Sequence, residues 1–279
     1  NKVSHILNMV SDMDCEYRKI LAEYPDIIGD SVMDIDPKHD VRHRIITNCS
    51  PIHSKPRPLG PDKYKAAKAE FDSLLKAKII EGSDSPWASP LHMVPKPDGS
   101  FRPCGDYRRL NIHTTVDRYP LPRISDLSVH LKGKKIFSKI DLIKSYHQLP
   151  MHPDDKEKTS IVTPFGAYAY NFMPFGLKNS APSFQRLMDR VFSGLDDRIF
   201  AYVDDGLMFS GSPAAHKVHI RSIFDRLRKF GLKINPAKCN FGLSEISFLG
   251  HKISADGISP MQKHVDSIKH FDVPRDLQG

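Results

Sequence analysis

Two adjacent carboxylates, Asp204 and Asp205, lie inside an otherwise apolar run that extends from residue 200 to residue 209. Ionised carboxylates in a buried strand carry a large desolvation cost, and the second adds like-charge repulsion. A divalent metal relieves both costs, because hard Mg²⁺ takes oxygen ligands and shares them with substrate phosphates. The pair therefore predicts a metal site for phosphoryl chemistry.

The chain contains two other Asp-Asp pairs, which serve as internal controls. Asp154-Asp155 precedes a charged run, and Asp196-Asp197 follows a glycine. Both contexts are typical of solvated turns, so we predict that these four carboxylates are exposed. Around Asp204 the apolar flanks favour a strand, and a glycine follows the acids directly, which predicts a hairpin with Asp204 and Asp205 at its tip.

A third carboxylate is expected nearby, since two metal ions need several oxygen ligands. Asp141 is the best candidate because it lies near the end of a predicted strand, residues 136–142. Only the fold can bring it to Asp204, which is 63 residues further along the chain. The alternative is that Asp141 caps a helix over residues 142–148.

The elements that must position these acids alternate between helices and strands, which indicates an α+β fold. The first fifty residues are interpreted as a leader or linker. The basic side chains of the last helix, Lys217, Arg221, Arg228 and Lys229, are predicted to be solvated. The predicted helices are 4–23, 61–82, 181–195 and 213–230, and the predicted strands and hairpins are 41–46, 87–106, 136–142, 168–172 and the hairpin around 204–205.

Composition limits the class of protein. The chain has 279 residues with 39% hydrophobic content, no apolar stretch near the ~18 residues of a membrane span, and no signal-peptide pattern. Its four cysteines lack zinc or disulfide spacing. Residues 1–50 carry 6 Lys+Arg against 9 Asp+Glu, so residues 51–279 carry 35 against 24, a net charge of +11. A polyanionic partner is expected.

Several segments together resemble a known family. Tyr202-Val203-Asp204-Asp205 matches the Y-x-D-D box of reverse transcriptases, and the likeness extends over residues 43–275 in the family's order. The chain is most similar to the polymerase of gypsy-type (Metaviridae) long-terminal-repeat retrotransposons. The other matching segments are Ser85-Pro86-Trp87-Ala88-Ser89-Pro90, Asp98-Gly99-Ser100-Phe101-Arg102, Asp106-Tyr107-Arg108-Arg109-Leu110-Asn111, Tyr119-Pro120-Leu121-Pro122, Phe137-Ser138-Lys139-Ile140-Asp141-Leu142, Tyr146-His147-Gln148, Met173-Pro174-Phe175-Gly176-Leu177, Ala181-Pro182-Ser183-Phe184-Gln185 and Phe248-Leu249-Gly250-His251.

The resemblance implies an α+β right-hand polymerase with fingers and palm subdomains, an antiparallel palm sheet packed on helices, and a thumb that is only begun. The expected division is an N-terminal leader or linker at 1–50, fingers at 51–115 and 149–180, palm at 116–148 and 181–255, and the start of a thumb or connection at 256–279.

The resemblance also implies an RNA-directed DNA polymerase, a nucleotidyltransferase that extends a primer 3′-hydroxyl with deoxynucleoside triphosphates. Asp141, Asp204 and Asp205 would be the catalytic residues and the ligands of two Mg²⁺ ions, with Mn²⁺ as the alternative cation. Leu249 and Gly250 would lie on the hairpin that grips the primer, although the glycine also suits a plain tight turn.

Five further residues match the family's substrate-binding positions. Lys96 and Arg102 would hold the triphosphate, roles that suit a point charge and a planar donor fork. Tyr146 would be an aromatic gate against a ribose 2′-hydroxyl, and Phe175 and Gly176 would flank the nucleotide. Without the likeness, Lys96 and Arg102 are best interpreted as an exposed hairpin tip and Tyr146 as a core aromatic.

The expected partners are an RNA or DNA template with its primer and deoxynucleoside triphosphates, but no membrane. Further polyprotein domains (protease, ribonuclease H, integrase) would lie outside this chain, and the expected location is the cytoplasm, within virus-like particles. Two alternatives stay open: a metal-dependent nuclease or phosphatase that uses the same carboxylates, and a decayed or domesticated element that only binds nucleic acid.

The chain also departs from the family's pattern. Ser145 stands where glycine is common, and Gly105 stands where valine or another apolar residue is common. Pro95 and Pro97 replace residues that are often basic. Gly105 is expected to weaken strand order without removing a catalytic group.

Overall fold

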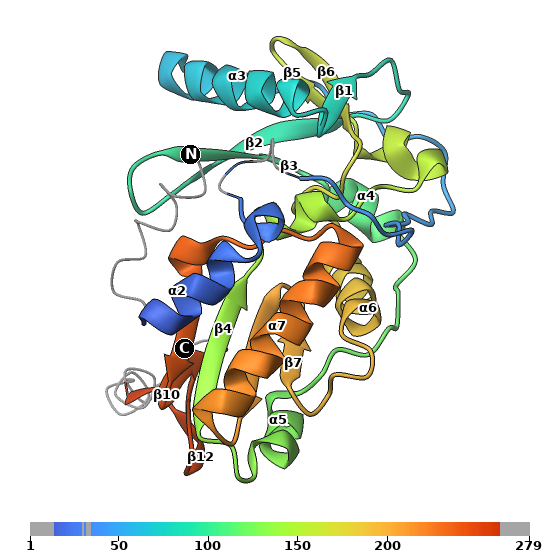
Figure 1. Ribbon diagram of the computed structural model, residues 1–279. Helices are drawn as coiled ribbons and strands as arrows, with labels where there is room; N and C mark the ends of the chain where they lie inside the picture. The colour runs from blue at the N-terminus through green and yellow to red at the C-terminus, as the bar shows by residue number, and fades with distance from the viewer. Residues whose placement is uncertain (1–13, 30, 32–34, 263–279) are drawn as a thin grey trace, which may run out of the picture.

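The computed structural model describes residues 14–29, 31 and 35–262. Figure 1 shows an upper part that contains helix α3 and strands β1, β2, β3, β5 and β6, above a lower part in which helix α7 crosses strands β4 and β7. Short helices make the connections: α4 (Arg108–His113), α5 (Ile124–Leu131) and the 3₁₀ helices Pro153–Thr159 and Pro236–Lys238.

The upper part is a five-stranded sheet in the order β1-β6-β5-β2-β3, in which only the β2–β5 pair is parallel. Helix α3 (Pro61–Lys76) packs on it through Phe71, whose ring lies 5.5 Å from Phe165 and 5.2 Å from Tyr168. The helix ends earlier than predicted, because Lys78 adopts a positive φ of 56° and the chain turns into β1. The strands are β1 (Ile80–Gly82), β2 (Ser89–Pro95), β3 (Phe101–Gly105), β5 (Ile161–Thr163) and β6 (Gly166–Tyr170).

The lower part is an antiparallel sheet in the order β7-β8-β4-β9 with one helix-covered face. Strand alternation sends Ile140 and Met208 into the core shared with the helices, and Phe137 and Phe209 to the opposite face. That second face packs against a three-stranded sheet, β10-β11-β12. The strands are β4 (Ile136–Asp141), β7 (Ile199–Tyr202), β8 (Asp205–Ser210), β9 (Asn240–Leu243), β10 (Glu245–Phe248), β11 (His251–Ser254) and β12 (Gly257–Pro260).

Helices α6 (Ser180–Val191) and α7 (Pro213–Phe230) cover the first face of this sheet. The predicted bounds of α7 are confirmed, since Ser212 caps its first turn and Gly231 ends it with a left-handed φ of 70°. Helix α6 ends at Val191, four residues before the predicted end. The α+β class predicted from the sequence is confirmed.

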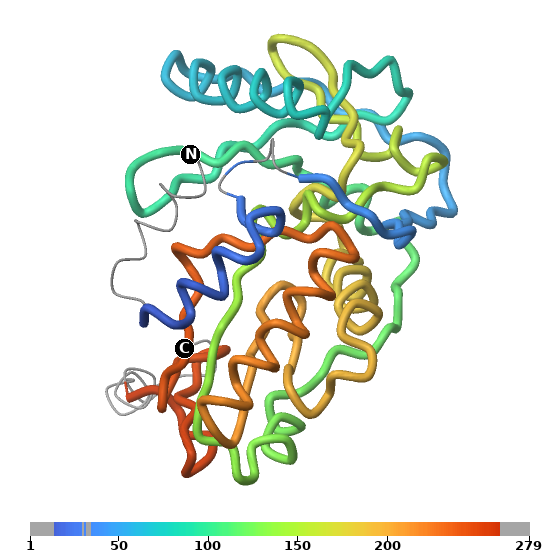
Figure 2. The backbone as a smooth tube through the Cα atoms, viewed as in Figure 1, coloured from blue at the N-terminus to red at the C-terminus, as the bar shows by residue number. Residues whose placement is uncertain are grey.

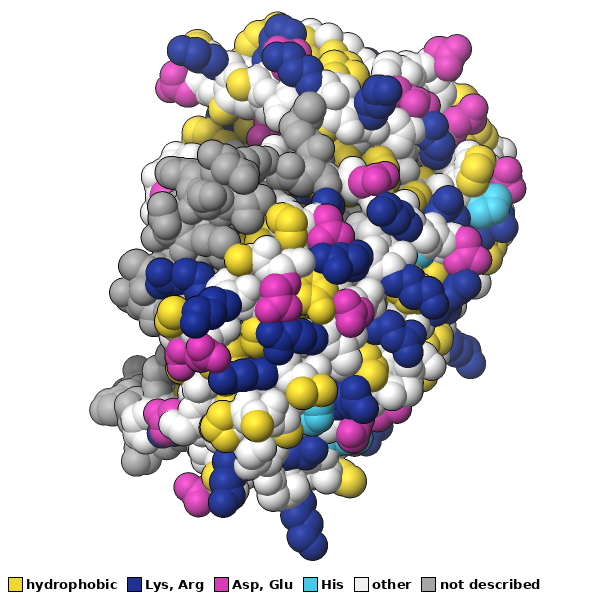
Figure 3. All heavy atoms as spheres, in the orientation of Figure 1, with side chains coloured by type: hydrophobic (Ala, Val, Ile, Leu, Met, Phe, Trp, Pro, Cys, Tyr) yellow, Lys and Arg dark blue, Asp and Glu magenta, His cyan; other side chains and the backbone are white. Residues whose placement is uncertain are grey.

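The N-terminal segment packs on α7, as Figures 1 and 2 show in blue beside orange. It contains α2 (Cys15–Ala22) and a 3₁₀ helix (Pro25–Ile27), and residues 4–13 of the predicted helix lie outside the described residues. The expectation that the α7 basic side chains are merely solvated is wrong for three of the four, because the acidic segment pairs with them. The pairs are Lys217–Glu16 at 3.0 Å, Arg221–Glu23 at 2.7 Å and Arg228–Asp26 at 2.7 Å. Figure 3 shows blue and magenta side chains intermixed on this face.

The same segment also reaches the end of β4 through backbone contacts. Ile28 forms a parallel bridge with Ile234, and Ile234 forms an antiparallel bridge with Leu142, the residue after Asp141. Asn235 N donates to the Asp141 carbonyl at 2.9 Å. The N-terminal segment is therefore part of the main core, to which Tyr17, Ile20 and Leu21 also belong.

Two local predictions are wrong. Residues 41–46 form no strand and make only an isolated bridge at His43, which pairs with Met151. Asp155 is not a solvated turn residue: its side chain is 3% exposed and pairs with Arg44 at 3.1 Å and Lys158 at 2.7 Å. Asp154, Asp196 and Asp197 are exposed as predicted.

The proposed subdomain boundaries stay a prediction, and residues 263–279 of the expected thumb lie outside the described residues. None of the helices in the described residues combines the length and the apolar character that crossing a membrane requires.

Candidate active site

Asp204 and Asp205 lie where β7 turns into β8. Tyr202 pairs with Asp205, so Val203 and Asp204 form a two-residue turn. Val203 has a φ of 52°, which is costly for a β-branched residue. The buried Gln185 of α6 holds this backbone in place: its Oε1 accepts from Val203 N at 2.7 Å, and its Nε2 donates to the Ala201 carbonyl at 3.0 Å.

Asp141 ends β4 directly opposite Asp205, its partner across the β4–β8 pair. The alternative helix-cap role is wrong, because the next helical turn is a 3₁₀ helix, Ser145–Gln148, and the residue before it is Lys144. Sheet pairing therefore brings the ends of β4 and β8 together, although their residues are far apart in sequence.

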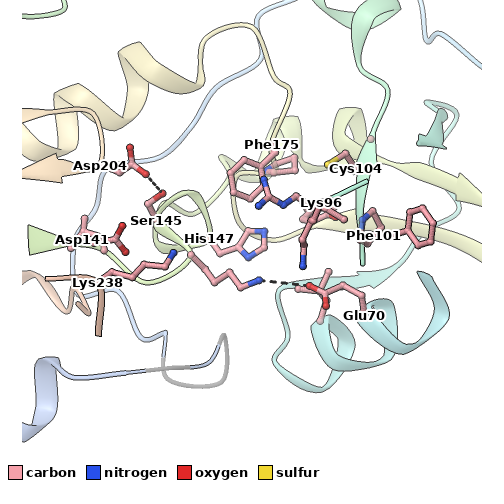
Figure 4. Close-up of a pocket in the computed structure, with 18 residues that line it drawn as sticks. Glu70, Lys96, Phe101, Cys104, Asp141, Ser145, His147, Phe175, Asp204 and Lys238 are labelled. Carbon is pink, nitrogen blue, oxygen red and sulfur yellow. Dashed lines mark hydrogen bonds and ion pairs between the residues drawn. The ribbon is translucent and has the colours of Figure 1, made fainter. Parts of the chain in front are cut away.

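The carboxylates of Asp141 and Asp204 line a cavity of about 310 Å³ between the two parts of the molecule. Lys96 and Arg102 line it from the β2–β3 hairpin, so they are not merely an exposed tip. Figure 4 shows the two acids at one end, Lys96 at the other, and His147 between them. Lys238 lies beside Asp141, and Lys144 forms an ion pair with Glu70 at 3.9 Å. The cavity thus has an acidic end and basic side chains facing it.

Asp205 behaves differently from its neighbours. Its side chain forms an ion pair with Lys139 at 2.8 Å, and it is absent from the cavity lining. Lys139 precedes Asp141 by two residues, on the same face of β4. In the part of the chain that the structure describes, no three His, Cys, Asp or Glu side chains converge closely enough to hold one metal ion.

The pKa of the Asp141 carboxyl is shifted by burial and by the charges of its neighbours. Burial raises the pKa of its carboxyl; the positive charge of Lys238 opposes this, and the charges of Asp205 and Asp204 raise it further. A cation bound beside Asp141 would offset both the burial and the like charge that disfavour its ionised form.

The aromatic residues form a wall beside the acids. Tyr146 packs against Phe175, with ring centroids 5.0 Å apart, and against Phe184 at 5.8 Å. Phe175 lines the cavity with the Arg102 guanidinium 5.7 Å from its ring centre, whereas Tyr146 is not among the residues that line it. Gly176 is exposed with a φ of 93°, and its carbonyl accepts from Asn111 at 2.8 Å. Phe175 is therefore one of the aromatic side chains that line the cavity, together with Phe101 and Tyr170.

Leu249 and Gly250 form the two-residue turn between β10 and β11, where Phe248 pairs with His251. Both have positive φ angles, 47° and 76°, which is the geometry of a type I′ hairpin. Neither lines the cavity.

Three residues that shape the site carried no assigned role in the sequence prediction. Ser145 donates to Asp204, Gln185 holds the turn, and Lys139 pairs with Asp205. A period-two pattern puts Lys139 on the face of Asp141, so this contact had a detectable signal. The hydrogen bond of Gln185 had none, because it depends on how α6 packs against the hairpin.

Comparison with known proteins gives a consistent family. The family described as "Reverse transcriptase (RNA-dependent DNA polymerase)" matches residues 94–253. The Pol polyprotein from transposon 412 of Drosophila melanogaster is 33% identical over 272 residues, 95% of this chain, and that from transposon 297 is 37% identical over 234 residues, 82% of this chain. The Tf2-3 polyprotein of Schizosaccharomyces pombe is 31% identical over 99% of this chain. The chain spans only 21–22% of the length of these relatives.

Solved structures support the fold. The foamy viral protease-reverse transcriptase dRH in complex with double-stranded DNA superposes with a TM-score of 0.84 at 21% identity, covering 99% of this chain and 49% of that one. The foamy viral enzyme in complex with an RNA/DNA hybrid gives a TM-score of 0.81 at 20% identity, covering 99% of this chain and 38% of that one. The right-hand polymerase fold implied by the Y-x-D-D resemblance is therefore confirmed. By its family match, the chain belongs to the reverse transcriptase (RNA-dependent DNA polymerase) family, and the relatives named above are transposon polyproteins.

Proposed function

We propose that this chain is the polymerase part of a gypsy-type retrotransposon polyprotein and extends a primer 3′-hydroxyl with deoxynucleoside triphosphates on an RNA or DNA template. The observation that carries the proposal is the cavity, where Asp141 and Asp204 lie opposite Lys96 and Arg102. An acidic end suits a metal-bound reaction centre, and a basic end suits a triphosphate.

Reverse transcriptases generally use divalent metal ions, and for this chain we propose two Mg²⁺ ions, with Mn²⁺ as the substitute. The residues fit such a group, because Asp141 and Asp204 expose carboxylate oxygens to one cavity and Asp205 adjoins them across the sheet. Two bound ions would activate the primer 3′-hydroxyl and neutralise charge on the departing pyrophosphate. Asp205 would have to exchange Lys139 for metal if it is also a ligand.

The basic side chains bind and orient the nucleotide in this proposal. Arg102 offers a planar fork of donors to phosphate oxygens, and Lys96 adds a mobile positive charge. The Phe175 ring gives the base or sugar an apolar surface, and the Tyr146 ring packs against it, with centroids 5.0 Å apart. In this proposal Tyr146 acts on the sugar through its contact with Phe175.

The proposed partners follow from the same chemistry. The net charge of +11 over residues 51–279 suits a template and primer bound mainly through their phosphates. Leu249 and Gly250 present a tight turn whose backbone can approach a primer closely. We also propose that the protein acts in the cytoplasm within virus-like particles. We propose that the same polyprotein carries protease, ribonuclease H and integrase domains.

The experiment is primer extension by the wild type and by Asp204→Asn on RNA and DNA templates, with deoxynucleotides and ribonucleotides offered separately. We expect the wild type to extend with deoxynucleotides, and the variant to lose extension while binding the duplex within a few fold of wild type. Normal extension by Asp204→Asn would overturn the assignment. If nucleotides are released from the nucleic acid when no deoxynucleoside triphosphates are added, a nuclease is favoured. If the chain binds nucleic acid but neither extends nor cleaves it, a decayed element is favoured.

A further inference from the structure

Ser145 makes a contact with the acidic end of the cavity that the proposed reaction does not yet use. Its hydroxyl donates to Asp204 Oδ2 at 2.8 Å, a bond drawn as a dashed line in Figure 4. The residue is 5% exposed and lines the same cavity as Asp141. A buried hydroxyl that donates to a part-buried carboxylate fixes where that carboxylate points.

Ser145 is itself held on a rigid support. It begins the 3₁₀ helix Ser145–Gln148, and the buried Gln148 side chain anchors that helix. Gln148 Nε2 donates to the carbonyls of Ile143 at 2.7 Å and Lys233 at 2.9 Å, and its Oε1 accepts from Lys233 N at 2.7 Å. The hydroxyl therefore has a fixed place from which to act on Asp204.

The backbone and the side chain of Asp204 are fixed by different residues. Gln185 fixes the turn through Val203 N, and Ser145 fixes one carboxylate oxygen. Like-charge repulsion from Asp141 favours a rotamer of Asp204 that points away, and the Ser145 bond opposes that movement.

We propose that Ser145 is a positioning residue that holds the Asp204 carboxylate on the cavity wall and thereby sets the affinity of the site for its divalent cation. This inference rests on the proposed function. Hydrogen-bond partners of metal ligands typically change metal affinity or activity by about 10–100-fold when removed, because the ligand loses its orientation.

The test uses the whole chain with Ser145→Ala, which removes the hydroxyl and little else, and Ser145→Gly as a second variant without a hydroxyl. The matched control is Ser183→Ala, since Ser183 is equally buried at 4% exposure but bonds His43 at 2.8 Å. Direct Mn²⁺ binding is measured by calorimetry without nucleotide, and the Mg²⁺ dependence of primer extension is measured separately.

Both Ser145 variants should bind Mn²⁺ about tenfold more weakly than wild type and need about tenfold more Mg²⁺ for half-maximal extension, with the rate at saturating metal largely restored. Ser183→Ala should match wild type in both. Unchanged Mn²⁺ affinity in the Ser145 variants would overturn the inference, and so would an equal loss in Ser183→Ala.

Failure of the proposed function would give a different result from failure of the Ser145 inference. If the wild type extends no primer, the proposed function fails, yet the Mn²⁺ titrations still report on Ser145. Asp204→Asn serves as the reference in those titrations. If it binds Mn²⁺ as wild type does, Asp204 is not a metal ligand and the role of Ser145 falls regardless of the reaction.

Discussion

Replacement of Gln185 by leucine tests whether one buried amide holds the turn formed by Val203 and Asp204. The change leaves Val203 N without its acceptor and Ala201 O without its donor. Loss of the buried N–H partner costs about 1–3 kcal/mol. Ala201 is only half-buried, so water replaces much of its bond, and burial of the leucine methyl groups returns about 1 kcal/mol.

We therefore expect Gln185→Leu to lower the free energy of unfolding by only about 1–2 kcal/mol, measured by urea titration. The effect on catalysis should be much larger. The positive φ of Val203 stores about 1–3 kcal/mol of strain, and a turn released from Gln185 can relax. Displacement of a reacting group by about 1 Å costs on the order of 100-fold in rate, so primer extension at saturating metal should fall by about that factor.

Asp189→Ala is the control for this variant. Asp189 is exposed; its Oδ1 accepts from the same Gln185 amide at 2.8 Å and its Oδ2 accepts from Tyr119 at 2.6 Å. Because both bonds are accessible to water, Asp189→Ala should cost about 1 kcal/mol of stability and should retain the extension rate. Wild-type unfolding and wild-type extension in Gln185→Leu would refute the reasoning, as would an equal loss of extension rate in Asp189→Ala.

Two other predictions concern stability. Burial lowers the pKa of His216 from 6.5 to about 4, so the folded chain favours the neutral imidazole. The contribution of this imidazole to the free energy of unfolding is complete above pH 6.5. It is lost as the pH falls toward 4, by about 3 kcal/mol at most. In urea titrations from pH 7.5 to 4.5, the free energy of unfolding should fall less steeply with pH for His216→Gln than for wild type. The same pH dependence in both proteins would contradict this. At Gly105 an added Cβ would lie 2.5 Å from the buried Tyr107 ring and 2.9 Å from Ile161, and the Tyr107 hydroxyl is tied to Thr159 O at 2.8 Å. Gly105→Ala should therefore cost about 1–3 kcal/mol by overpacking, whereas Gly82→Ala, with no atom within 4 Å of its Cβ, should not; equal stabilities would count against this explanation.

Gly105 also illustrates what the sequence could and could not predict. The sequence shows that Gly105 departs from the family's pattern. The reason for a glycine at this position is that the Tyr107 ring fills the space of a side chain, and that depends on packing. Helix α7 and the Asp204 hairpin were predictable because proline, serine, glycine and apolar spacing mark them locally. The burial of Asp155 was not, since its partner Arg44 lies 111 residues earlier. The contact between Lys139 and Asp205 lies between these cases: strand alternation puts Lys139 on the face of Asp141, but its pairing with Asp205 depends on the register of β4 against β8.

The docking of the N-terminal segment on α7 has a consequence for how the chain folds during synthesis. Glu16 and Lys217 are 201 residues apart, and Asp26 and Arg228 are 202 apart. Helix α2 is synthesised well before α7, so the surface that α7 contributes around Tyr17, Ile20 and Leu21 is made only later. Until then this apolar stripe has no native partner, and such surfaces promote aggregation. The Ile28–Ile234–Leu142 contacts also form only at that late stage. The support behind Asp141 is therefore completed late, and a nascent chain that stops short of α7 should lack it.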